Sequence, residues 1–473
     1  MALYACLFQS VAFFARGDPD RYYHFAISRM TAEGGLVRAL PQAAELGWHE
    51  IFYEKEFLFH GLGALAYGIA GDSGVTAIAF FLGAATVAVL FEIGCAFLSA
   101  RAATLLVLAT ILLQPNFVTR LALVRPHVWG TLFFSILCLA LVRRGKWLAL
   151  ASGAFFSLGY HAMYIPLTLL AAGALAAIFV SRTKDKRLLV ACGFGVAGII
   201  IGVLVNPYFP ANMVLGFTSL KIALSQGQGL PLDFGSELQP LGWVEISKGY
   251  LFPFVLMALG LRFHKKRDVN HTLFLGVAIV FWTAFLKTPR LVEYTFPVTA
   301  IVGFLAIAPR GRSERWALAL TCLAFVLALP LWYGFFVHAA EYFPDYSSDY
   351  LAAIDKLPPD ARGKKVFNCE WSAGAYLLYR RPDVRFIDFS DPILLAQVDS
   401  KKSMLRLMTL QGRVRDAYSV VHDAFASDYV LCASPTLVAQ LEKDRHFRDL
   451  HAGKTVHLFE VLTPAAASRA VPD

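Results

Sequence analysis

Charged residues are scarce in this chain of 473 residues: Asp, Glu, Lys and Arg make up 16% of it, against about a quarter in an average soluble protein. With 57% hydrophobic residues as well, the composition excludes an ordinary soluble enzyme. The net charge of +9 does not indicate nucleic-acid binding, because 15 basic residues lie in short loops between apolar segments, where the positive-inside rule explains them. We therefore expect a membrane-embedded chain with membrane lipids, and no nucleic acid, as partners.

Several common site signatures are also missing. The seven cysteines show neither CxxC nor Cys/His spacing, which excludes a zinc site built from thiolates. Without a G-x-G-x-x-G motif or a P-loop, the sequence gives no support for dinucleotide or nucleoside triphosphate binding. The apolar N-terminal stretch lacks the basic region and the A-x-A exit of a cleavable signal peptide, so we expect it to be a membrane span.

Apolar runs of spanning or nearly spanning length recur as far as Phe336. They predict an α-helical polytopic membrane domain, residues 1–336, with about eleven transmembrane helices. The predicted spans are residues 2–15, 75–100, 103–115, 127–142, 147–160, 162–180, 188–205, 249–262, 271–286, 295–309 and 316–336. After Phe336 the composition becomes an ordinary soluble mixture, which predicts a second domain at residues 337–473.

The apolar segment 57–70 decides how the chain is threaded. As a helix its 14 residues would cover about 21 Å, too short for a hydrocarbon core of about 30 Å. If it lies along the interface instead, five basic loops fall on one side, with 15 basic and three acidic residues. This threading predicts a cytoplasmic N-terminus, a first outer loop at residues 16–73 and an extracytoplasmic C-terminal domain, in a membrane such as the bacterial inner membrane.

The first outer loop carries carboxylates, aromatic rings and histidines at both ends. It opens with Gly17-Asp-Pro-Asp-Arg-Tyr-Tyr-His-Phe25 and closes with Tyr53-Glu-Lys-Glu-Phe-Leu-Phe-His60. Beside a membrane, this set suits chemistry on an amphiphile, because a carboxylate takes up a proton or holds a divalent cation while nearby cations receive a phosphate. Alternatively, Asp18 and Asp20 only cap a helix that begins at Arg21.

Two later outer loops, residues 114–127 and 287–297, place cations on the outer face, against the charge bias. These cations are Arg120, Arg125, Lys287 and Arg290. Arginine suits bidentate contacts with phosphate, so the four side chains are candidates for clamping an anionic lipid headgroup. Alternatively, each of them snorkels from a helix end toward lipid phosphates in general. His161 lies near the same face, and it and Tyr208 are candidates for lining the same cavity, although turn chemistry alone also explains the segment around Tyr208.

The order of these elements and motifs resembles the GT-C superfamily of polyprenyl-phosphate-sugar glycosyltransferases. That superfamily includes protein O-mannosyltransferases, aminoarabinose transferases and the catalytic subunits of oligosaccharyltransferases. Asp20-Arg-Tyr22-Tyr23 is similar to the oligosaccharyltransferase form of the first-loop motif, and Asp18 to Tyr22 with Tyr53-Glu-Lys55 is similar to the aminoarabinose-transferase form. The chain departs from the family where Lys55-Glu-Phe-Leu58 replaces Lys-Pro-Pro-Leu, and it has no WWDYG-like acceptor motif.

The resemblance implies an inverting glycosyltransferase. It would take a sugar from a polyprenyl-phosphate-linked donor and deliver it to a lipid, glycan or protein acceptor on the extracytoplasmic face. The implied catalytic residues are Asp20, as general base or metal ligand, and Asp18 as second choice. The implied substrate-binding residues are Tyr22, Tyr23, Glu54, Lys55, His60, Arg125, His127, Lys287 and Arg290. A divalent ion, Mg or Mn, would have Asp20 and His60 as its ligands.

Two other functions stay open. One is a catalytically silent scaffold or assembly subunit that has kept the fold. The other is a transporter, which usually needs charged residues at mid-membrane and internal repeats. The predicted spans carry almost no charge apart from Glu92, and no repeat is evident, so the sequence favours the transferase.

Beyond Lys364 the pattern alternates between strands and helices, which predicts a small, partly parallel α/β sheet. The predicted strands are residues 365–370, 384–388, 429–432 and 456–460, and the predicted helices are 373–379, 416–425 and 435–443. We expect this domain to dock the acceptor or to cover the outer cavity. Cys369 and Cys432 would pair if their strands are neighbours, but we expect two free buried thiols.

Overall fold

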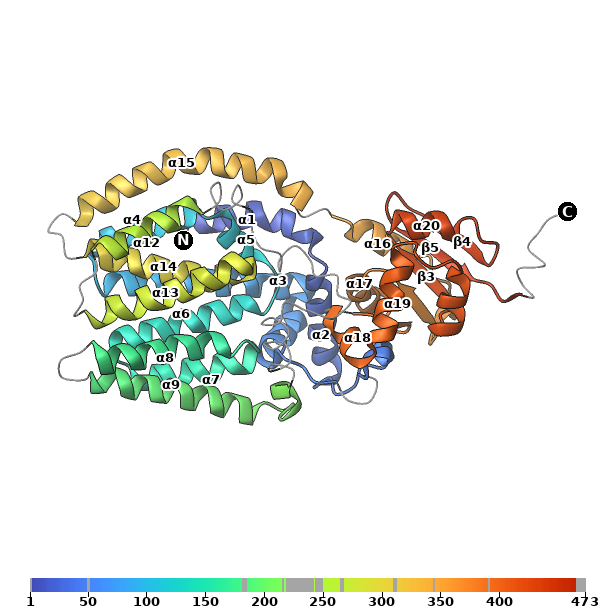
Figure 1. Cartoon of the computed structure of the whole chain (residues 1–473), viewed down its shortest axis with the longest axis horizontal. Coiled ribbons are helices and arrows are strands. Elements are labelled where there is room, and N and C mark those ends of the chain that lie inside the picture. The colour runs from blue at the N-terminus through green and yellow to red at the C-terminus, as the bar shows by residue number, and fades with distance from the viewer. Residues whose placement is uncertain are drawn as a thin grey trace.

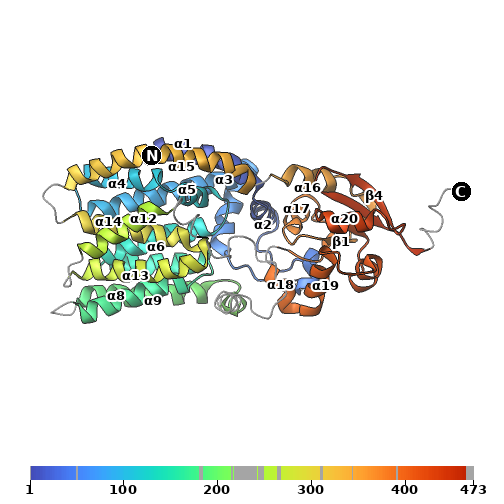
Figure 2. The ribbon, with the colours of Figure 1, turned by 45° about the horizontal axis from the view of Figure 1, so that its top comes forward.

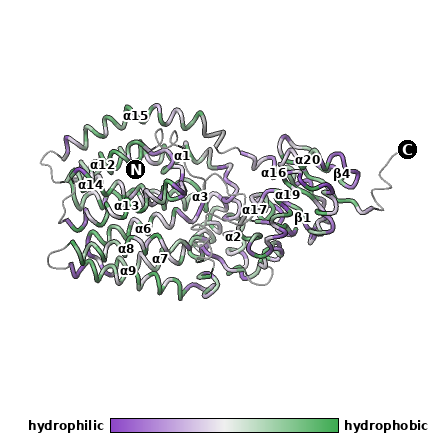
Figure 3. Tube along the Cα trace, in the orientation of Figure 1, coloured by the Kyte–Doolittle hydropathy of each residue, from purple (hydrophilic) through white to green (hydrophobic). Residues whose placement is uncertain are grey.

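The computed structural model describes residues 2–48, 52–180, 185–214, 217, 242, 250–263, 268–308, 313–342, 345–389 and 392–464. Within these ranges a long helical bundle is followed by a small α/β domain at one of its ends (Figures 1 and 2). Hydrophobic residues predominate along the bundle helices, whereas the α/β domain mixes hydrophobic and hydrophilic residues (Figure 3). The change in composition after Phe336 therefore coincides with the end of the last bundle helix, α15 (Ser313–Tyr342).

Each predicted span coincides with a helix of the bundle. These helices are α1 (Ala2–Phe14), α3 (Phe57–Cys95), α4 (Ala100–Leu112), α6 (His127–Arg143), α7 (Lys146–Gly159), α8 (Tyr164–Phe179), α9 (Lys186–Val205), α12 (Leu251–Arg262), α13 (Val269–Lys287), α14 (Val292–Ile307) and α15. Among the described residues, five helices are long and apolar enough to cross a membrane, or six if the bent pair α4 and α5 (Pro115–Ala122) forms one span. The chain is thus a polytopic membrane protein, and the count of eleven crossings stays a prediction.

Helix α3 is broken near the place where the interfacial segment was expected to end. Ala70 and Gly71 leave the helical conformation, and Gly71 has φ of +58°, in the left-handed region that favours glycine. A Cβ on Gly74 would lie 2.1 Å from the carbonyl oxygen of Ala66, so the two arms approach too closely for any larger residue. The break therefore separates residues 57–69 from the spanning part of α3.

Polar contacts gather the basic loops at one end of the bundle. They join Arg143 to Glu92 at 2.7 Å, Arg144 to Asp185 at 2.9 Å and to Asn270 at 2.8 Å, and Ser99 to Glu314 at 2.7 Å. This end lies opposite the α/β domain (Figure 1). The charge pattern predicted this grouping, and the assignment of this end to the cytoplasm stays a prediction.

The C-terminal domain contains a five-stranded sheet in the order β2-β1-β3-β5-β4. The strands are β1 (Lys365–Asn368), β2 (Arg385–Phe386), β3 (Tyr429–Cys432), β4 (Phe447–Ala452) and β5 (His457–Val461). The pairs β1–β2 and β1–β3 are parallel, and β3–β5 and β4–β5 are antiparallel, as a partly parallel α/β sheet requires. Its helices include α16 (Ser347–Ile354), α17 (Ala373–Arg380), α18 (Pro392–Val398), α19 (Ser400–Leu410) and α20 (Pro435–Leu441).

Cys369 and Cys432 form a disulfide, so the expectation of two free thiols was wrong. Strands β1 and β3 are parallel neighbours whose register pairs Asn368 with Leu431. Cys369 directly follows β1 and Cys432 is the last residue of β3, so the two cysteines come next in register, and their Cα atoms lie 5.0 Å apart. A structural disulfide is typical of an oxidising compartment, which agrees with the predicted extracytoplasmic side.

The first outer loop and the C-terminal domain share one hydrophobic core. Tyr23 and Ile27 of α2 (Asp20–Gly34), together with Trp48, are buried in the same cluster as Tyr376 and Phe389 of the domain. Helix α2 packs against α17, and the two helices lie side by side at the junction (Figure 1). The domain is therefore anchored on the helix that begins with Asp20.

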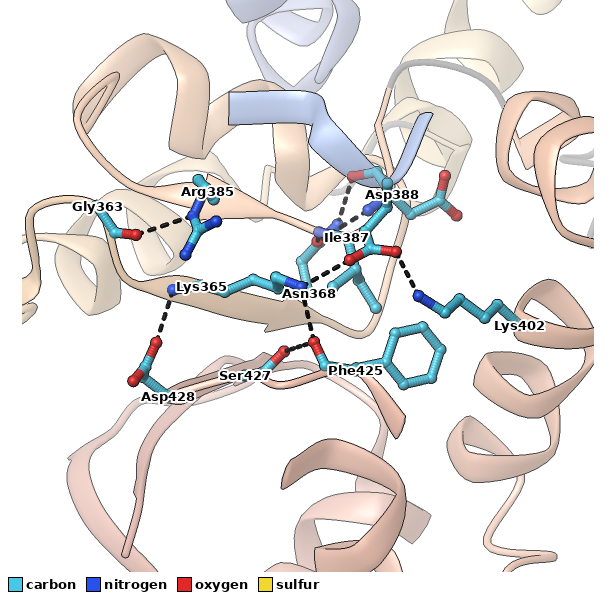
Figure 4. Close-up of polar contacts among 11 residues, drawn as sticks. Gly363, Lys365, Asn368, Arg385, Ile387, Asp388, Lys402, Phe425, Ser427 and Asp428 are labelled. Atoms are coloured by element: carbon cyan, nitrogen blue, oxygen red, sulfur yellow. Dashed lines mark hydrogen bonds and ion pairs between the residues drawn. The ribbon is translucent and has the colours of Figure 1, made fainter. Parts of the chain in front are cut away.

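An ion-pair clamp reinforces this junction. Glu45, in the 3-10 segment Pro41–Leu46, accepts hydrogen bonds from the Nζ atoms of Lys365 and Lys402, each at 2.6 Å. The two lysines come from β1 and α19, and their side chains converge at this contact (Figure 4). Arg29 of α2 adds a 2.8 Å hydrogen bond to the carbonyl oxygen of Tyr379.

Candidate active site

The candidate site lies where α2 begins, at the end of the bundle that meets the C-terminal domain. Helix α2 starts at Asp20, and its N-cap position is taken by Pro19, which has no capping side chain. The backbone N–H of Asp20 donates to Asp18 Oδ1 at 3.3 Å, so Asp18 makes one weak local bond of the kind that a capping role predicts. Its stronger contacts are with a distant arginine.

Arg125 lies between the two aspartates. Its Nε donates to Asp18 Oδ2 at 2.8 Å, its Nη2 donates to the other oxygen of Asp18, and its Nη1 lies 3.1 Å from Asp20 Oδ2. The Asp18 side chain is 2% exposed, whereas that of Asp20 is 23% exposed. Asp18 is thus buried in a bidentate pair, whereas the Asp20 side chain is partly exposed to solvent.

A sharp bend brings Arg125 to this position. Helices α4 and α5 meet at 85°, and Pro115 occupies the first turn of α5, where its missing N–H costs no hydrogen bond. Almost all of α5 is buried, so the expected outer loop 114–127 runs into the protein. Arg125 then follows in the turn between α5 and α6.

Beside the aspartates, three buried side chains form a hydrogen-bonded chain. His60 Nδ1 contacts Glu54 Oε1, and His60 Nε2 lies 2.8 Å from His24 Nδ1. Burial, and next the neighbouring His60, lower the pKa of His24 well below its usual value, so His24 is neutral at pH 7. Glu54 thus orients His60, which in turn orients His24. These contacts link α2 to the start of α3.

A second acidic residue, Glu56, lies at the start of α3. Its Oε1 is 3.4 Å from His161 Nδ1 and 4.0 Å from Lys55 Nζ. Burial opposes ionisation of Glu56, but the charge of Lys55 and the contact with His161 outweigh it and lower the pKa. Arg290, in the 3-10 turn Pro289–Leu291, is close enough to act on the pKa of His161.

The remaining predicted cations have different surroundings. Arg120 forms a buried ion pair with Glu293 of α14, at 3.2 Å, so it is engaged inside the protein. His127 is buried and its Nε2 lies 2.6 Å from the carbonyl oxygen of Arg120, which places it beside this pair. Lys287 is exposed at the last position of α13.

The two tyrosines of the first-loop motif face the junction with the C-terminal domain. The Tyr22 ring lies 4.7 Å from that of Tyr376 and 5.2 Å from that of Tyr379, both in α17. The Tyr23 ring makes edge contacts with His60 at 5.5 Å and with Phe389 at 5.2 Å. Both rings therefore couple the site to the outer domain.

The structure brings together Asp18, Asp20 and Arg125 directly, and Glu54 with His60. Sequence reasoning did not select His24 as a site residue, although it lies in the first-loop motif, because its contact with His60 depends on the fold. It also did not select Glu293, because a single Glu next to an apolar segment has no pattern of its own. It also missed Glu56, although the departure from Lys-Pro-Pro-Leu at this position was a visible signal.

Neither a known family model nor any curated protein matches this sequence. Among solved structures, ArnT from Cupriavidus metallidurans bound to undecaprenyl phosphate is similar, with a TM-score of 0.61 and 13% identity over 100% of this chain and 99% of that chain. The oligosaccharyltransferase of Archaeoglobus fulgidus tethered with an acceptor peptide is similar over 91% of this chain and 69% of that chain, with a TM-score of 0.57 and 14% identity. AglB from the same organism, in complex with an inhibitory peptide and a dolichol-phosphate, has a TM-score of 0.58 and 12% identity, over 94% and 72%.

These values show that the chain shares the fold of ArnT and of the archaeal oligosaccharyltransferase, two of the protein types that its sequence resembles. Identities of 12 to 14% concern the fold alone. A shared fold does not determine the function of the chain, which depends on the residues of its own site.

Proposed function

We propose that this protein is an integral-membrane glycosyltransferase. In this proposal it transfers a sugar from a polyprenyl-phosphate-linked donor to a lipid, glycan or protein acceptor on the extracytoplasmic face, with inversion at the anomeric carbon. The observation that carries the proposal is the Asp18–Arg125–Asp20 arrangement, in which one aspartate is sealed and the other is accessible. It lies at the end of a GT-C fold whose solved relatives include a complex with undecaprenyl phosphate and one with a dolichol-phosphate.

Asp20 is the general base of this scheme. Its carboxylate would take the proton of the acceptor nucleophile as the nucleophile attacks the anomeric carbon and the bond to the lipid phosphate breaks. Arg125 binds both carboxylates and therefore fixes the direction of Asp20, while Asp18 holds Arg125 in place. Such positioning matters because a reacting group must stay within hydrogen-bond reach of the proton that it accepts.

The leaving phosphate needs positive charge near it. Lys55 lies 4.0 Å from its carboxylate neighbour, at the edge of ion-pair range, and Arg290 is close enough to His161 to act on its pKa. We assign the phosphate to Lys55 and Arg290, with the exposed Lys287 near its entry. The pair Glu54 and His60 orders the loop that presents Lys55.

A divalent ion at Asp20 and His60 is part of the initial hypothesis. Among the described residues, no group of three or more His, Cys, Asp or Glu side chains is arranged to hold a metal ion. Arg125 occupies the position of a cation between the two aspartates, and His60 is engaged by Glu54 and His24. These surroundings do not fit a divalent ion, and in the proposed reaction Asp20 acts as a general base and not as a metal ligand.

The test is the release of undecaprenyl phosphate from a panel of undecaprenyl-phosphate sugars, with a membrane extract as acceptor. Purified wild type is compared with Asp20→Asn and with a control, Glu92→Gln, at the opposite end of the bundle. Loss of the general base should lower the rate by about 10² to 10⁴. Binding of undecaprenyl phosphate and the thermal midpoint should stay unchanged in Asp20→Asn.

Two results would contradict the proposal in different ways. Normal release by Asp20→Asn would show that another residue is the base. If the wild type binds undecaprenyl phosphate but releases none from any donor in the panel, the silent scaffold becomes the better assignment.

A further inference from the structure

Glu56 is a buried carboxylate with one unused oxygen. The residue is 2% exposed, and no described residue donates a hydrogen bond to its Oε2, which has almost no solvent contact. An ionised carboxylate that is buried with an unmet hydrogen bond is costly, and natural proteins keep few such atoms. A ligand that donates a hydrogen bond to this oxygen would remove the cost.

Glu56 does not act as a helix cap in the described structure. Glu56 is the N-cap residue of α3, where a carboxylate could satisfy the free N–H groups of the first turn. Its side chain makes no capping hydrogen bond among the described residues, and its backbone has φ of −127° and ψ of 43°. The other oxygen, Oε1, faces His161 at 3.4 Å. The carboxylate thus points away from the helix end and toward the loop between α7 and α8.

Its neighbours are the cations that the proposed function assigns to the lipid phosphate. Lys55 precedes it in the chain, and the Lys55 Nζ lies 4.0 Å from Oε1. Arg290 acts electrostatically on His161, which is the partner of Glu56. A sugar joined to a phosphate held by these cations would bring its hydroxyl groups to the side where Glu56 lies.

On the basis of the proposed function, we propose that Glu56 is a sugar-recognition residue: its Oε2 accepts a hydrogen bond from a hydroxyl or amino group of the donor sugar, while Oε1 lies 3.4 Å from His161 Nδ1. The ligand class is a polyprenyl-phosphate sugar that carries such a donor group within reach of the phosphate. Glu56 then determines which sugar is accepted, and it takes no part in the proton transfer at Asp20.

The experiment compares wild type, Glu56→Gln and the control Glu92→Gln in two binding assays. One uses undecaprenyl phosphate without a sugar, and the other uses the undecaprenyl-phosphate sugar that the wild type prefers. Loss of a hydrogen bond to a charged group corresponds to about a 10- to 100-fold weaker interaction. Glu56→Gln should show this loss, and a matching rise in KM, only with the glycosylated lipid.

A set of deoxy sugars gives a second measurement that does not depend on the variant. One deoxy donor should bind the wild type about 10- to 100-fold more weakly and lose nothing further in Glu56→Gln, because the two changes remove the same hydrogen bond. A purely structural role of Glu56 would produce no such dependence on one hydroxyl or amino position.

The alternative outcomes separate the two proposals. Equal weakening of both lipids, or no weakening of either, would overturn the role of Glu56 in sugar recognition and leave the transferase in place. Wild-type protein that binds no glycosylated lipid in the panel would overturn both the proposed function and this inference.

Discussion

Replacing Arg120 by methionine should strand Glu293 as an unpaired charge inside the protein. The Glu293 side chain is 0% exposed and the Arg120 side chain is 10% exposed, with Nη2 and Oε1 3.2 Å apart. Removing one partner of a buried pair costs about 3 to 5 kcal/mol, because the remaining charge has lost its compensation. The double change Arg120→Met with Glu293→Leu removes both charges, so it should cost only about 1 kcal/mol. Glu293→Leu alone also leaves a buried charge unpaired, so the two single costs together exceed the cost of the double change by about 5 kcal/mol or more, which is the coupling energy between the two sites.

The assay is equilibrium unfolding in detergent, run on the wild type, both single variants and the double variant, together with binding of undecaprenyl phosphate. A structural pair predicts that stability and lipid binding recover together in the double variant. Single-variant costs that simply add in the double variant would refute the pairing. A stable Arg120→Met protein that no longer binds undecaprenyl phosphate would instead show that Arg120 is a headgroup ligand, the role that its place in an outer loop first suggested.

Two further changes test the C-terminal domain. Glu45→Gln weakens both hydrogen-bonded ion pairs of the clamp, which are 2.6 Å long each. It should lower the free energy of unfolding, measured by chemical unfolding, by about 1 to 3 kcal/mol. Unchanged stability would show that the clamp contributes nothing. Burial raises the pKa of Glu370 above 4.5, so its carboxyl group binds a proton more tightly in the folded domain, and folding gains stability as pH falls through that raised pKa toward 4.5. Glu370→Gln should therefore raise the thermal midpoint at pH 7, with a gain that disappears near pH 4; a lower midpoint at pH 7 would contradict this sign.

Most of the membrane domain could be predicted from local sequence. An apolar run long enough to cross lipid has to be helical, because only a helix satisfies its own backbone there. The length argument also separated residues 57–70 from the span that follows, and the chain breaks at Ala70 and Gly71. Helix α5 was missed, because its eight residues are too few to span and its Pro, Asn and Thr read as a loop.

The apolar strands β1, β2, β3 and β5 of the C-terminal sheet were predicted from the sequence, whereas the polar strand β4 was missed. Strand β4 carries Arg448 and Asp449 at exposed positions on the edge of the sheet, so it shows no buried alternation. The disulfide depends on which strands are neighbours. That information is tertiary, because Cys369 and Cys432 are 63 residues apart and local pattern does not indicate their register.

In the candidate site too, residue types could be predicted from the sequence, whereas contacts between residues far apart in the chain could not. Sequence reasoning selected Asp18, Asp20 and Arg125 because their residue types suit acid–base and phosphate chemistry. It could not indicate that one guanidinium, 107 residues away, binds both carboxylates. Nor could it distinguish the roles of the two aspartates, because the exposed fractions of their side chains, 2% for Asp18 and 23% for Asp20, depend on the fold.

That difference in exposure supplies the physical reason for choosing Asp20 as the base. A base has to meet the proton of an incoming nucleophile, and Asp18 has both oxygens bound by Arg125 in a sealed position. Asp20 gives one oxygen to the same guanidinium, and its side chain is 23% exposed. In the proposed reaction Arg125, selected from sequence as a phosphate ligand, would instead orient the base Asp20, and Lys55 and Arg290 would bind the leaving phosphate. If that division holds, Arg125→Lys should lower kcat more than it weakens binding of undecaprenyl phosphate, because a lysine cannot hold both carboxylates in one planar fork.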